Sequence, residues 1–117
     1  MQVQVNTDDH IQGGAPLAQW VRDEAGSRLA RFKDLITRLE VFLTDVDGAK
    51  SGVNDKRCRL EARVVSRQPV TVTAEADKMA GAFINAVDKL ASALDTDLGR
   101  VKDRNGRDTI RAAQDQE

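Results

Sequence analysis

Aromatic residues are scarce in this sequence, which has one tryptophan, three phenylalanines and no tyrosine. Proteins that hold single-stranded nucleic acid by stacking need aromatic side chains on which successive bases can lie. Because aromatics make up only 3% of the chain, the composition argues against base stacking as its mode of nucleic-acid binding.

Cysteine and histidine occur once each, as Cys58 and His10. A single cysteine cannot form an internal disulfide bond, and no cysteine–histidine set has the spacing of a metal site. We therefore expect no metal and no cofactor. Cys58 is interpreted as a small hydrophobic residue on the inward side of a strand, and His10 as an ordinary loop residue. A reducing cytoplasm is the expected location.

Long apolar runs are missing, and the opening segment MQVQVNTDDH has neither a basic start nor an apolar core. The sequence therefore predicts neither a signal peptide nor a membrane-spanning helix. Catalytic patterns are missing as well: there is no nucleophile–base arrangement, no carboxylate pair with defined spacing, and no phosphate-cradling loop, since Gly13-Gly14 alone does not make one. We expect no enzyme activity and no small-molecule substrate.

An excess of charge of either sign is also missing. The chain has 18 basic and 19 acidic residues, which gives a formal net charge of −1. This balance argues against strong non-specific attraction to phosphate unless the positive charge is segregated on one surface.

Apolar periodicity, in contrast, is well developed. Alternation with a period of two predicts four strands, and apolar residues at three- and four-residue steps predict two amphipathic helices. The expected strands cover residues 1–5, 36–46, 56–65 and 70–74, and the expected helices cover 15–33 and 77–104. The apolar stripe of the second helix consists of Met79, Phe83, Val87, Leu90, Leu94, Leu98 and Val101. Gly99 is a candidate interruption of this helix.

The element order is β-α-β-β-β-α, and every strand has one apolar face that the helices can cover. This predicts an α+β fold, a two-layer sandwich with a four-stranded sheet, two helices packed on one face and an open polar face. Short connections make the last three strands an antiparallel meander, whereas the helical crossover favours a first strand parallel to its neighbour. We expect one domain, residues 1–104, and a polar, flexible tail, residues 105–117.

Three segments, taken in this order, resemble a known family. VQVNTDDHI is similar to the family's opening strand and loop, and LAQWV followed by SRLARFKDLITRLEVFL is similar to its first helix and second strand. VTVTAEADKMAGAFINAVDKL is similar to its last strand and long helix, with Asp-Lys-Leu at Asp88, Lys89 and Leu90. The family is that of the ribosome hibernation-promoting factors, or ribosome-associated translation inhibitors, and the resemblance covers residues 1–104.

The resemblance implies a non-catalytic protein that binds the small ribosomal subunit and its rRNA near the decoding centre and silences translation under stress or in stationary phase. It implies a short form, without the dimerisation domain of longer members, and thus a monomer or weak dimer. The residues that it assigns to rRNA phosphate are Arg28, Lys89, Arg100 and Lys102. On spacing alone, Lys89, Arg100 and Lys102 would be interpreted as a solvated helix surface, where charges contribute little.

The second helix also departs from the family pattern. Ser92, Thr96 and Leu98 occupy positions where the family often has basic residues, and Asp95 and Asp97 add negative charge. These departures are compatible with weaker RNA affinity, a different partner or a different docking mode on the ribosome. They also motivate an alternative function, a non-catalytic protein-interaction module of the same fold that has lost rRNA binding.

A further candidate surface is the outward side of the second and third predicted strands. Its cations are Arg38, Arg57, Arg59 and Arg63. They form either a basic ladder that touches RNA backbone or a set of cross-strand pairs with Glu40 and Glu61. Phe42 also points outward, and we expect it to mark a dimer contact, to lie under the C-terminal segment or to be exposed.

Overall fold

The computed structural model describes residues 1–8, 14–45 and 56–109, with side chains described as far as residue 96. The strands are β1 (Gln2–Thr7), β2 (Ile36–Asp45), β3 (Lys56–Val64) and β4 (Val70–Ala76), and the helices are α1 (Gly14–Arg28), the short 3-10 helix η1 (Ala30–Phe32) and α2 (Met79–Thr109). The predicted order β-α-β-β-β-α is confirmed, and η1 is an addition to it.

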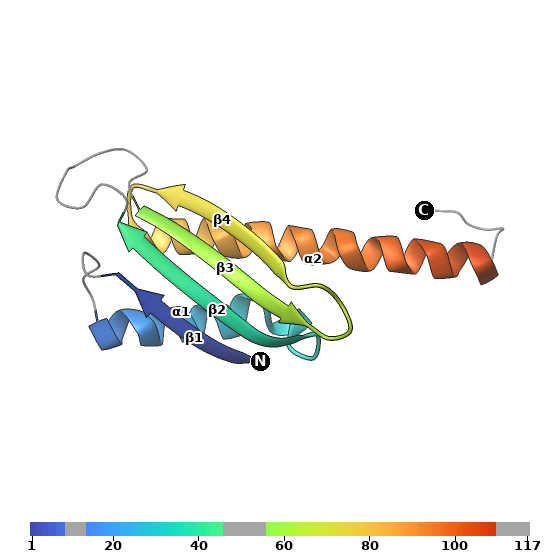
Figure 1. Ribbon diagram of the computed structural model, residues 1–117, viewed down its shortest axis with the longest axis horizontal. Coiled ribbons are helices and arrows are strands. Elements are labelled where there is room, and N and C mark those ends of the chain that lie inside the picture. The colour runs from blue at the N-terminus through green and yellow to red at the C-terminus, as the bar shows by residue number, and fades with distance from the viewer. Residues whose placement is uncertain (9–13, 46–55, 110–117) are drawn as a thin grey trace.

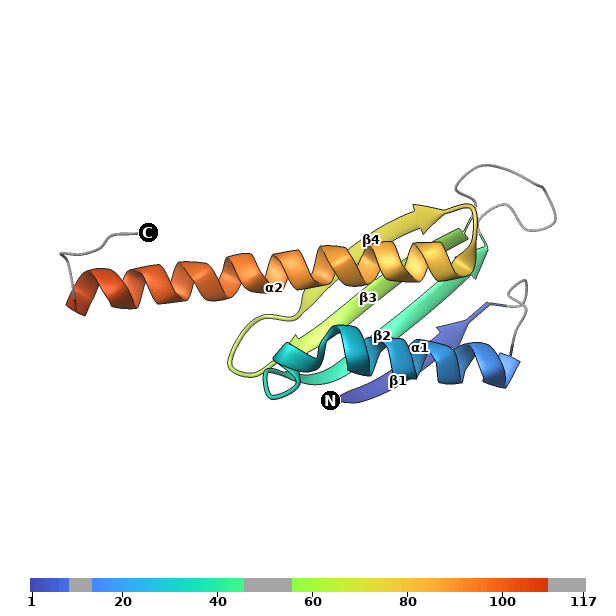
Figure 2. The ribbon, with the colours of Figure 1, turned by 180° about the vertical axis from the view of Figure 1, so that it is seen from behind.

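The four strands form one sheet in the order β1-β2-β3-β4. β1 pairs with β2 in parallel, with Val3 opposite Leu39, whereas β2–β3 and β3–β4 are antiparallel pairs. Both helices lie on the same side of the sheet, behind it in Figure 1 and in front of it in Figure 2. The predicted two-layer α+β sandwich is therefore confirmed, including its parallel first strand and its antiparallel meander.

Strand alternation gives the sheet one covered face and one open face. In β2, Leu39, Val41 and Leu43 are buried, whereas the residues between them stay partly exposed. The buried side chains of β3 are Cys58, Leu60, Ala62 and Val64, and those of α2 are Ala82, Phe83, Ala86, Val87, Leu90 and Leu94. Burial of one large aliphatic or aromatic side chain contributes about 1.5–3 kcal/mol before entropy is counted. This set therefore holds α2 on the sheet.

The first helix is shorter than the sequence predicts. α1 ends at Arg28, and Leu29, with φ −107° and ψ 19°, leads into η1. The amide of Phe32 donates to the carbonyl of Leu29 at 2.9 Å, which is the i→i−3 contact of a tighter turn. Both of these side chains are buried. The prediction of a single helix over 15–33 is therefore wrong for its last turn. There the chain forms a tighter turn in which the side chains of Leu29 and Phe32 are both buried in the core.

The second helix is longer than expected. α2 continues through Gly99 and ends at Thr109, past the expected end at Arg104. Its 31 residues span roughly 46 Å at about 1.5 Å per residue, and its last part extends past the sheet (Figure 1). Among the described helices, none has an apolar stretch of the length that a membrane span requires. Of the expected tail, residues 110–117 lie outside the described residues.

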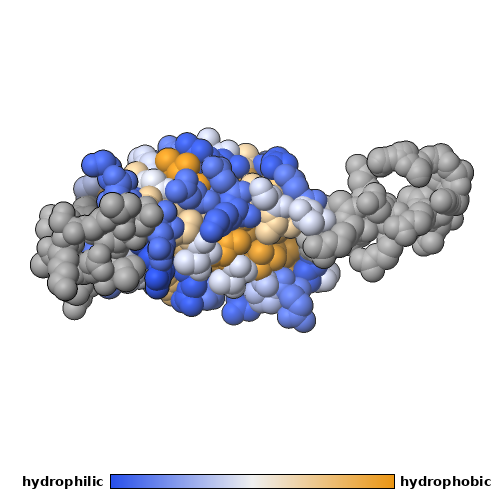
Figure 3. All heavy atoms as spheres, turned by 90° about the horizontal axis from the view of Figure 1, so that it is seen from above, coloured by the Kyte–Doolittle hydropathy of each residue, from blue (hydrophilic) through white to orange (hydrophobic). Residues whose placement is uncertain are grey.

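Apolar side chains reach the surface along the seam between β4 and α2. Figure 3, which looks down on this side of the molecule, shows hydrophobic atoms between hydrophilic ones. Partly buried apolar residues of these two elements are Val70, Val72, Ala76, Met79, Ile84 and Ala91. The helix layer thus leaves the edge strand β4 incompletely covered.

Candidate nucleic-acid interface

Arg28, the first cation assigned to phosphate, lies in the last turn of α1 and is exposed. Its Nε donates to Oε1 of Glu24, one turn earlier, at 2.8 Å. Exposed pairs of this kind contribute about 0.3–0.5 kcal/mol and are weakened by salt. The contact leaves the two terminal amino groups of the Arg28 guanidinium available, so it does not prevent Arg28 from binding a phosphate.

Lys89, the second cation, has a structural contact that sequence reasoning missed. Its Nζ donates to the backbone carbonyl of Thr73 on β4 at 2.8 Å. An ammonium group has three N–H donors, so two remain for solvent or a ligand, and the residue is exposed. Lys89 therefore ties α2 to the edge strand of the sheet while it keeps its charge at the surface.

Arg100 and Lys102 lie within α2, but only their backbone is described, and nothing is known of where their side chains point. The remaining two cations lie on different parts of the helix layer. Lys89 reaches β4, at one edge of the sheet, whereas α1, which has Arg28 in its last turn, contacts β1 at the other edge. The structure thus places Arg28 and Lys89 on the same layer without bringing them together.

A bidentate ion pair joins η1 to α2 within the helix layer. Arg31 of η1 donates from Nη1 and Nη2 to the two carboxylate oxygens of Asp95 on α2, at 2.7 and 2.9 Å. The same guanidinium lies 4.4 Å from the ring centroid of Phe32. Nothing in the sequence indicated this pair, since its partners are 64 residues apart. The carboxylate of Asp95, which adds negative charge where the family pattern is basic, is therefore neutralised by an arginine of the same chain.

Charge is balanced over the described helices and the residues that flank them. The basic residues of 14–35 and 77–96 are Arg22, Arg28, Arg31, Lys33, Lys78 and Lys89, and the acidic ones are Asp23, Glu24, Asp34, Asp77, Asp88 and Asp95. These two sets are equal in number, so this part of the helix layer has no net positive charge. Binding to a polyanion would depend on where individual cations lie.

The open face is the side of the sheet away from the helices. Its side chains come from Gln2, Gln4 and Asn6 of β1, from Arg38, Glu40, Phe42 and Thr44 of β2, from Arg57, Arg59, Glu61 and Arg63 of β3, and from Thr71, Thr73 and Glu75 of β4. This composition confirms the predicted polar face.

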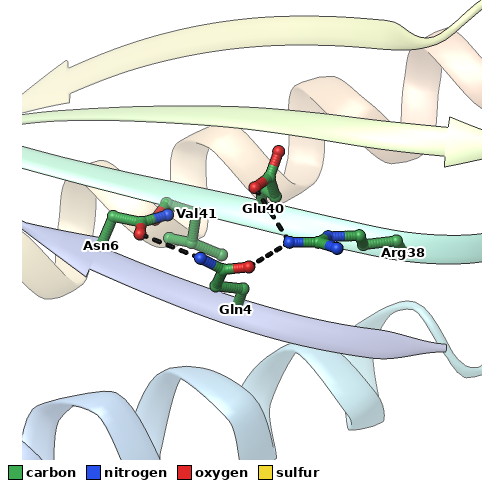
Figure 4. Close-up of polar contacts among 5 residues, drawn as sticks. All are labelled: Gln4, Asn6, Arg38, Glu40 and Val41. Carbon is green, nitrogen blue, oxygen red and sulfur yellow. Dashed lines mark hydrogen bonds and ion pairs between the residues drawn. The ribbon is translucent and has the colours of Figure 1, made fainter.

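Ion pairs on the open face run mainly along the strands. Arg38 contacts Glu40 at 3.3 Å, and Arg59 contacts Glu61 at 3.5 Å, in each case two residues along the same strand. Figure 4 shows the Arg38 guanidinium between Glu40 and Gln4, whose side-chain oxygen also accepts from it. The arginines do pair with Glu40 and Glu61, but the expected cross-strand direction is wrong for both pairs.

The register explains this direction of pairing. Arg38 lies opposite Arg63, and Glu40 lies opposite Glu61, so like charges face each other across β2 and β3. An ion pair does cross between β3 and β4, where Arg57 contacts Glu75 at 2.7 Å. The sequence could not show this arrangement, because a shift in strand register changes every cross-strand neighbour.

Phe42 is half-buried on the open face, directly opposite Arg59. The Arg59 guanidinium carbon lies 4.3 Å from the ring centroid, within the range of a cation–π contact. The outward direction of Phe42 is therefore as predicted, and its cover comes from Arg59.

Two features bear on reactive groups within the described part of the chain. Burial raises the pKa of the Cys58 thiol to about 12, so the nucleophilic thiolate is not formed near neutral pH. Among the described residues, no three histidine, cysteine, aspartate or glutamate side chains are grouped to hold a metal ion. His10 lies outside the described residues.

When the chain is compared with known protein families, one family model matches it. The model of the Sigma 54 modulation protein / S30EA ribosomal protein family matches residues 3–105. Among curated proteins, none matches the chain.

Two solved structures share the fold. The N-terminal domain of Protein Y from Thermus thermophilus superposes with a TM-score of 0.61 at 19% identity, over 80% of this chain and 94% of that one. A ribosomal subunit interface protein from Coxiella burnetii superposes with a TM-score of 0.62 at 16% identity, over 85% of this chain and 99% of that one.

Proposed function

Because this chain belongs to the Sigma 54 modulation protein / S30EA ribosomal protein family, we propose that it is a ribosome-associated protein that binds the rRNA of the small subunit and silences translation under stress or in stationary phase. The family match supports the proposal most strongly, since it spans both layers of the sandwich, from β1 to the last part of α2. The likeness to a ribosomal subunit interface protein agrees with it.

The proposed action is occupation of a site on the ribosome, without a covalent step. Arg28, Lys89, Arg100 and Lys102 would each neutralise a phosphate of the rRNA backbone, and such contacts position a protein without reading bases. Each contact to single-stranded RNA releases counterions and adds about −0.7 to the slope of log affinity against log salt. Four contacts therefore predict a slope of roughly −3.

Co-sedimentation with ribosomes across a salt series tests the proposal. The full chain should associate with small subunits at low salt and dissociate as salt rises, and it should inhibit translation in a cell-free system. The double variant Arg28→Gln and Lys89→Gln should make the slope of log affinity against log salt less negative by about 1.4, and it should inhibit translation less strongly. Arg22→Gln, which removes an exposed cation from the same helix as Arg28, is the matched control.

Failure of the wild-type chain to associate with ribosomes in a salt-dependent way would contradict the proposal. Equal slopes for the double variant and for the Arg22→Gln control would separately contradict the assignment of Arg28 and Lys89.

The balanced charge of the described helix layer favours the alternative function, a protein-interaction module that has lost rRNA binding. The partly apolar seam between β4 and α2 would then contact a protein partner. Co-purification of one protein in a fixed ratio, with no ribosome association at any salt concentration, would support this alternative. Association with purified, protein-free rRNA would eliminate it.

A further inference from the structure

We propose that Arg38 and Arg63 together bind one backbone phosphate of an RNA strand on the open face of the sheet. This site lies on the opposite side of the sheet from the helix residues assigned to phosphate above. It rests on the proposed function for the identity of the RNA, whereas its binding chemistry depends only on the two arginines and their surroundings.

The register places two like charges directly opposite each other. Arg38 of β2 and Arg63 of β3 are partners in the antiparallel ladder. Like charges in this position destabilise a sheet because their side chains share the same face. An anion between them would convert this repulsion into two attractions. Phosphate oxygens suit the planar fork of donors that each guanidinium presents.

Neither arginine is fully satisfied by the protein. Within the described residues, the exposed side chain of Arg63 contacts no carboxylate and donates no hydrogen bond. Arg38 uses Nη2 for Glu40 and Gln4, while its Nε is buried without an acceptor. A buried donor without an acceptor is unfavourable, so the present arrangement of Arg38 leaves stabilisation to be gained from a ligand.

The rest of the open face confines the site to a single phosphate. Next along the strands come Glu40 and Glu61, again opposite each other, which repel an anion. The following cation on β3, Arg59, is four residues from Arg63, or roughly 13 Å along the strand. Arg59 also contacts Glu61 and the ring of Phe42. Arg38 and Arg63 are thus separated from Arg57 and Arg59, the other two arginines of the open face.

An RNA strand fits this surface better than a free anion. The two side chains stand on an open sheet face, with Arg38 39% exposed, so they do not enclose a small ion. A single bridged phosphate then needs further contacts elsewhere on the polymer to bind well. The amides of Gln2 and Gln4 on β1 lie beside Arg38 and Glu40 in the ladder and offer neutral donors to sugar or phosphate oxygens.

The test uses the full chain and a short oligouridylate, followed by NMR of arginine Nε–H groups and backbone amides, with inorganic phosphate as a second titrant. Resonances of Arg38 and Arg63 should shift and saturate with the RNA. Arg63→Gln should weaken binding about tenfold, the loss expected for one charge-assisted contact. It should also make the salt slope less negative by about 0.7.

The matched control is Arg57→Gln, which removes the same charge from the same strand and face. Arg57 is already paired with Glu75, so its loss should change RNA affinity less than twofold. Arg63→Lys keeps the charge and should restore part of the affinity. Unchanged amide spectra away from β2 and β3 would show that each variant is folded.

Equal effects of Arg63→Gln and Arg57→Gln would overturn the site, because only net charge would then matter. Saturation by inorganic phosphate at the same concentrations as RNA would overturn the choice of RNA as occupant. A wild-type chain that shows the RNA effect but does not co-sediment with ribosomes would retain this site and refute the proposed function. A wild-type chain that co-sediments with ribosomes, but whose Arg38 and Arg63 resonances do not shift with RNA, would refute this site and retain the proposed function.

Discussion

Arg31 and Asp95 form a bidentate ion pair between η1 and α2, with both oxygens of the carboxylate held at 2.7 and 2.9 Å. The side chains are 59% and 49% exposed, so the pair contributes modestly to stability, at about 0.2–1 kcal/mol. Its larger consequence is electrostatic, because it occupies a guanidinium in the same helix layer as Arg28 and Lys89, which the family resemblance assigns to rRNA phosphate.

Replacement of Asp95 by Asn should strengthen ribosome binding, because it releases Arg31 for a phosphate. We expect the salt slope to become more negative by about 0.7, measured by co-sedimentation. Asp88→Asn is the control, since within the described residues the Asp88 side chain has no partner and its loss releases no arginine. Identical slopes for the two variants would show that Arg31 stays away from RNA even when it is free.

Replacement of Lys89 by Gln should loosen α2 from β4, because the hydrogen bond from Nζ to the Thr73 carbonyl is lost. The free energy of unfolding should fall by about 0.5–1.5 kcal/mol in urea, and amides near Thr73 should exchange faster with solvent. Lys78→Gln, at an exposed position just before α2, should leave both measurements unchanged. Unaltered exchange in β4 for Lys89→Gln would mean that this contact does not hold the helix.

Replacement of Phe83 by Ala should destabilise the protein by about 3–5 kcal/mol, because the side chain is fully buried and leaves a cavity. Its ring meets Trp20 edge-on, with centroids 5.6 Å apart and an interplanar angle of 67°. Trp20 is the single tryptophan, so its fluorescence should report both the loss of this contact and the unfolding transition. A loss below about 1.5 kcal/mol would contradict the central place of Phe83 in the core.

Replacement of Gly26 by Ala should stabilise the protein by about 0.5–1 kcal/mol. Gly26 is helical within α1, and a Cβ built there meets nothing within 4 Å. Gly81→Ala is the matched control on α2, where the new Cβ would lie 3.3 Å from the Cβ of Ala76. The gain at Gly81 should be smaller or negative. A thermal melt that ranks the two substitutions the other way would contradict the prediction.

Stability should fall at high pH because of Cys58. Burial raises the pKa of its thiol from 9.0 to about 12 in the folded chain. Above pH 9 the unfolded chain loses this proton and the folded chain keeps it, so stability decreases as pH rises through this window and is unaffected below it. The difference in unfolding free energy between wild type and Cys58→Ala should shrink by about 1 kcal/mol between pH 9 and pH 10. A constant difference would mean that the thiol is not desolvated.

The sequence by itself determined the element order, the covered and open faces of the sheet, and most of the core. These follow from local rules, since alternation at Leu39, Val41 and Leu43 can only place all three on one face of a strand. Steps of four, three and four residues from Phe83 to Leu94 likewise make one stripe along α2. The end of α1 escaped prediction because the tight turn at Leu29 is stabilised by burial against distant elements, which no local pattern records.

The partners of the charged residues were decided by the tertiary structure. Arg31 and Asp95, Lys89 and the carbonyl of Thr73, and Arg38 and Arg63 meet through packing and strand register, each across a long stretch of chain. Coulomb energy and hydrogen bonding depend on distances of a few ångströms, whereas the sequence gives only separations along the chain. The identity of each charge was therefore readable from the sequence, but whether it is paired or left available for a ligand became known only when the chain was folded.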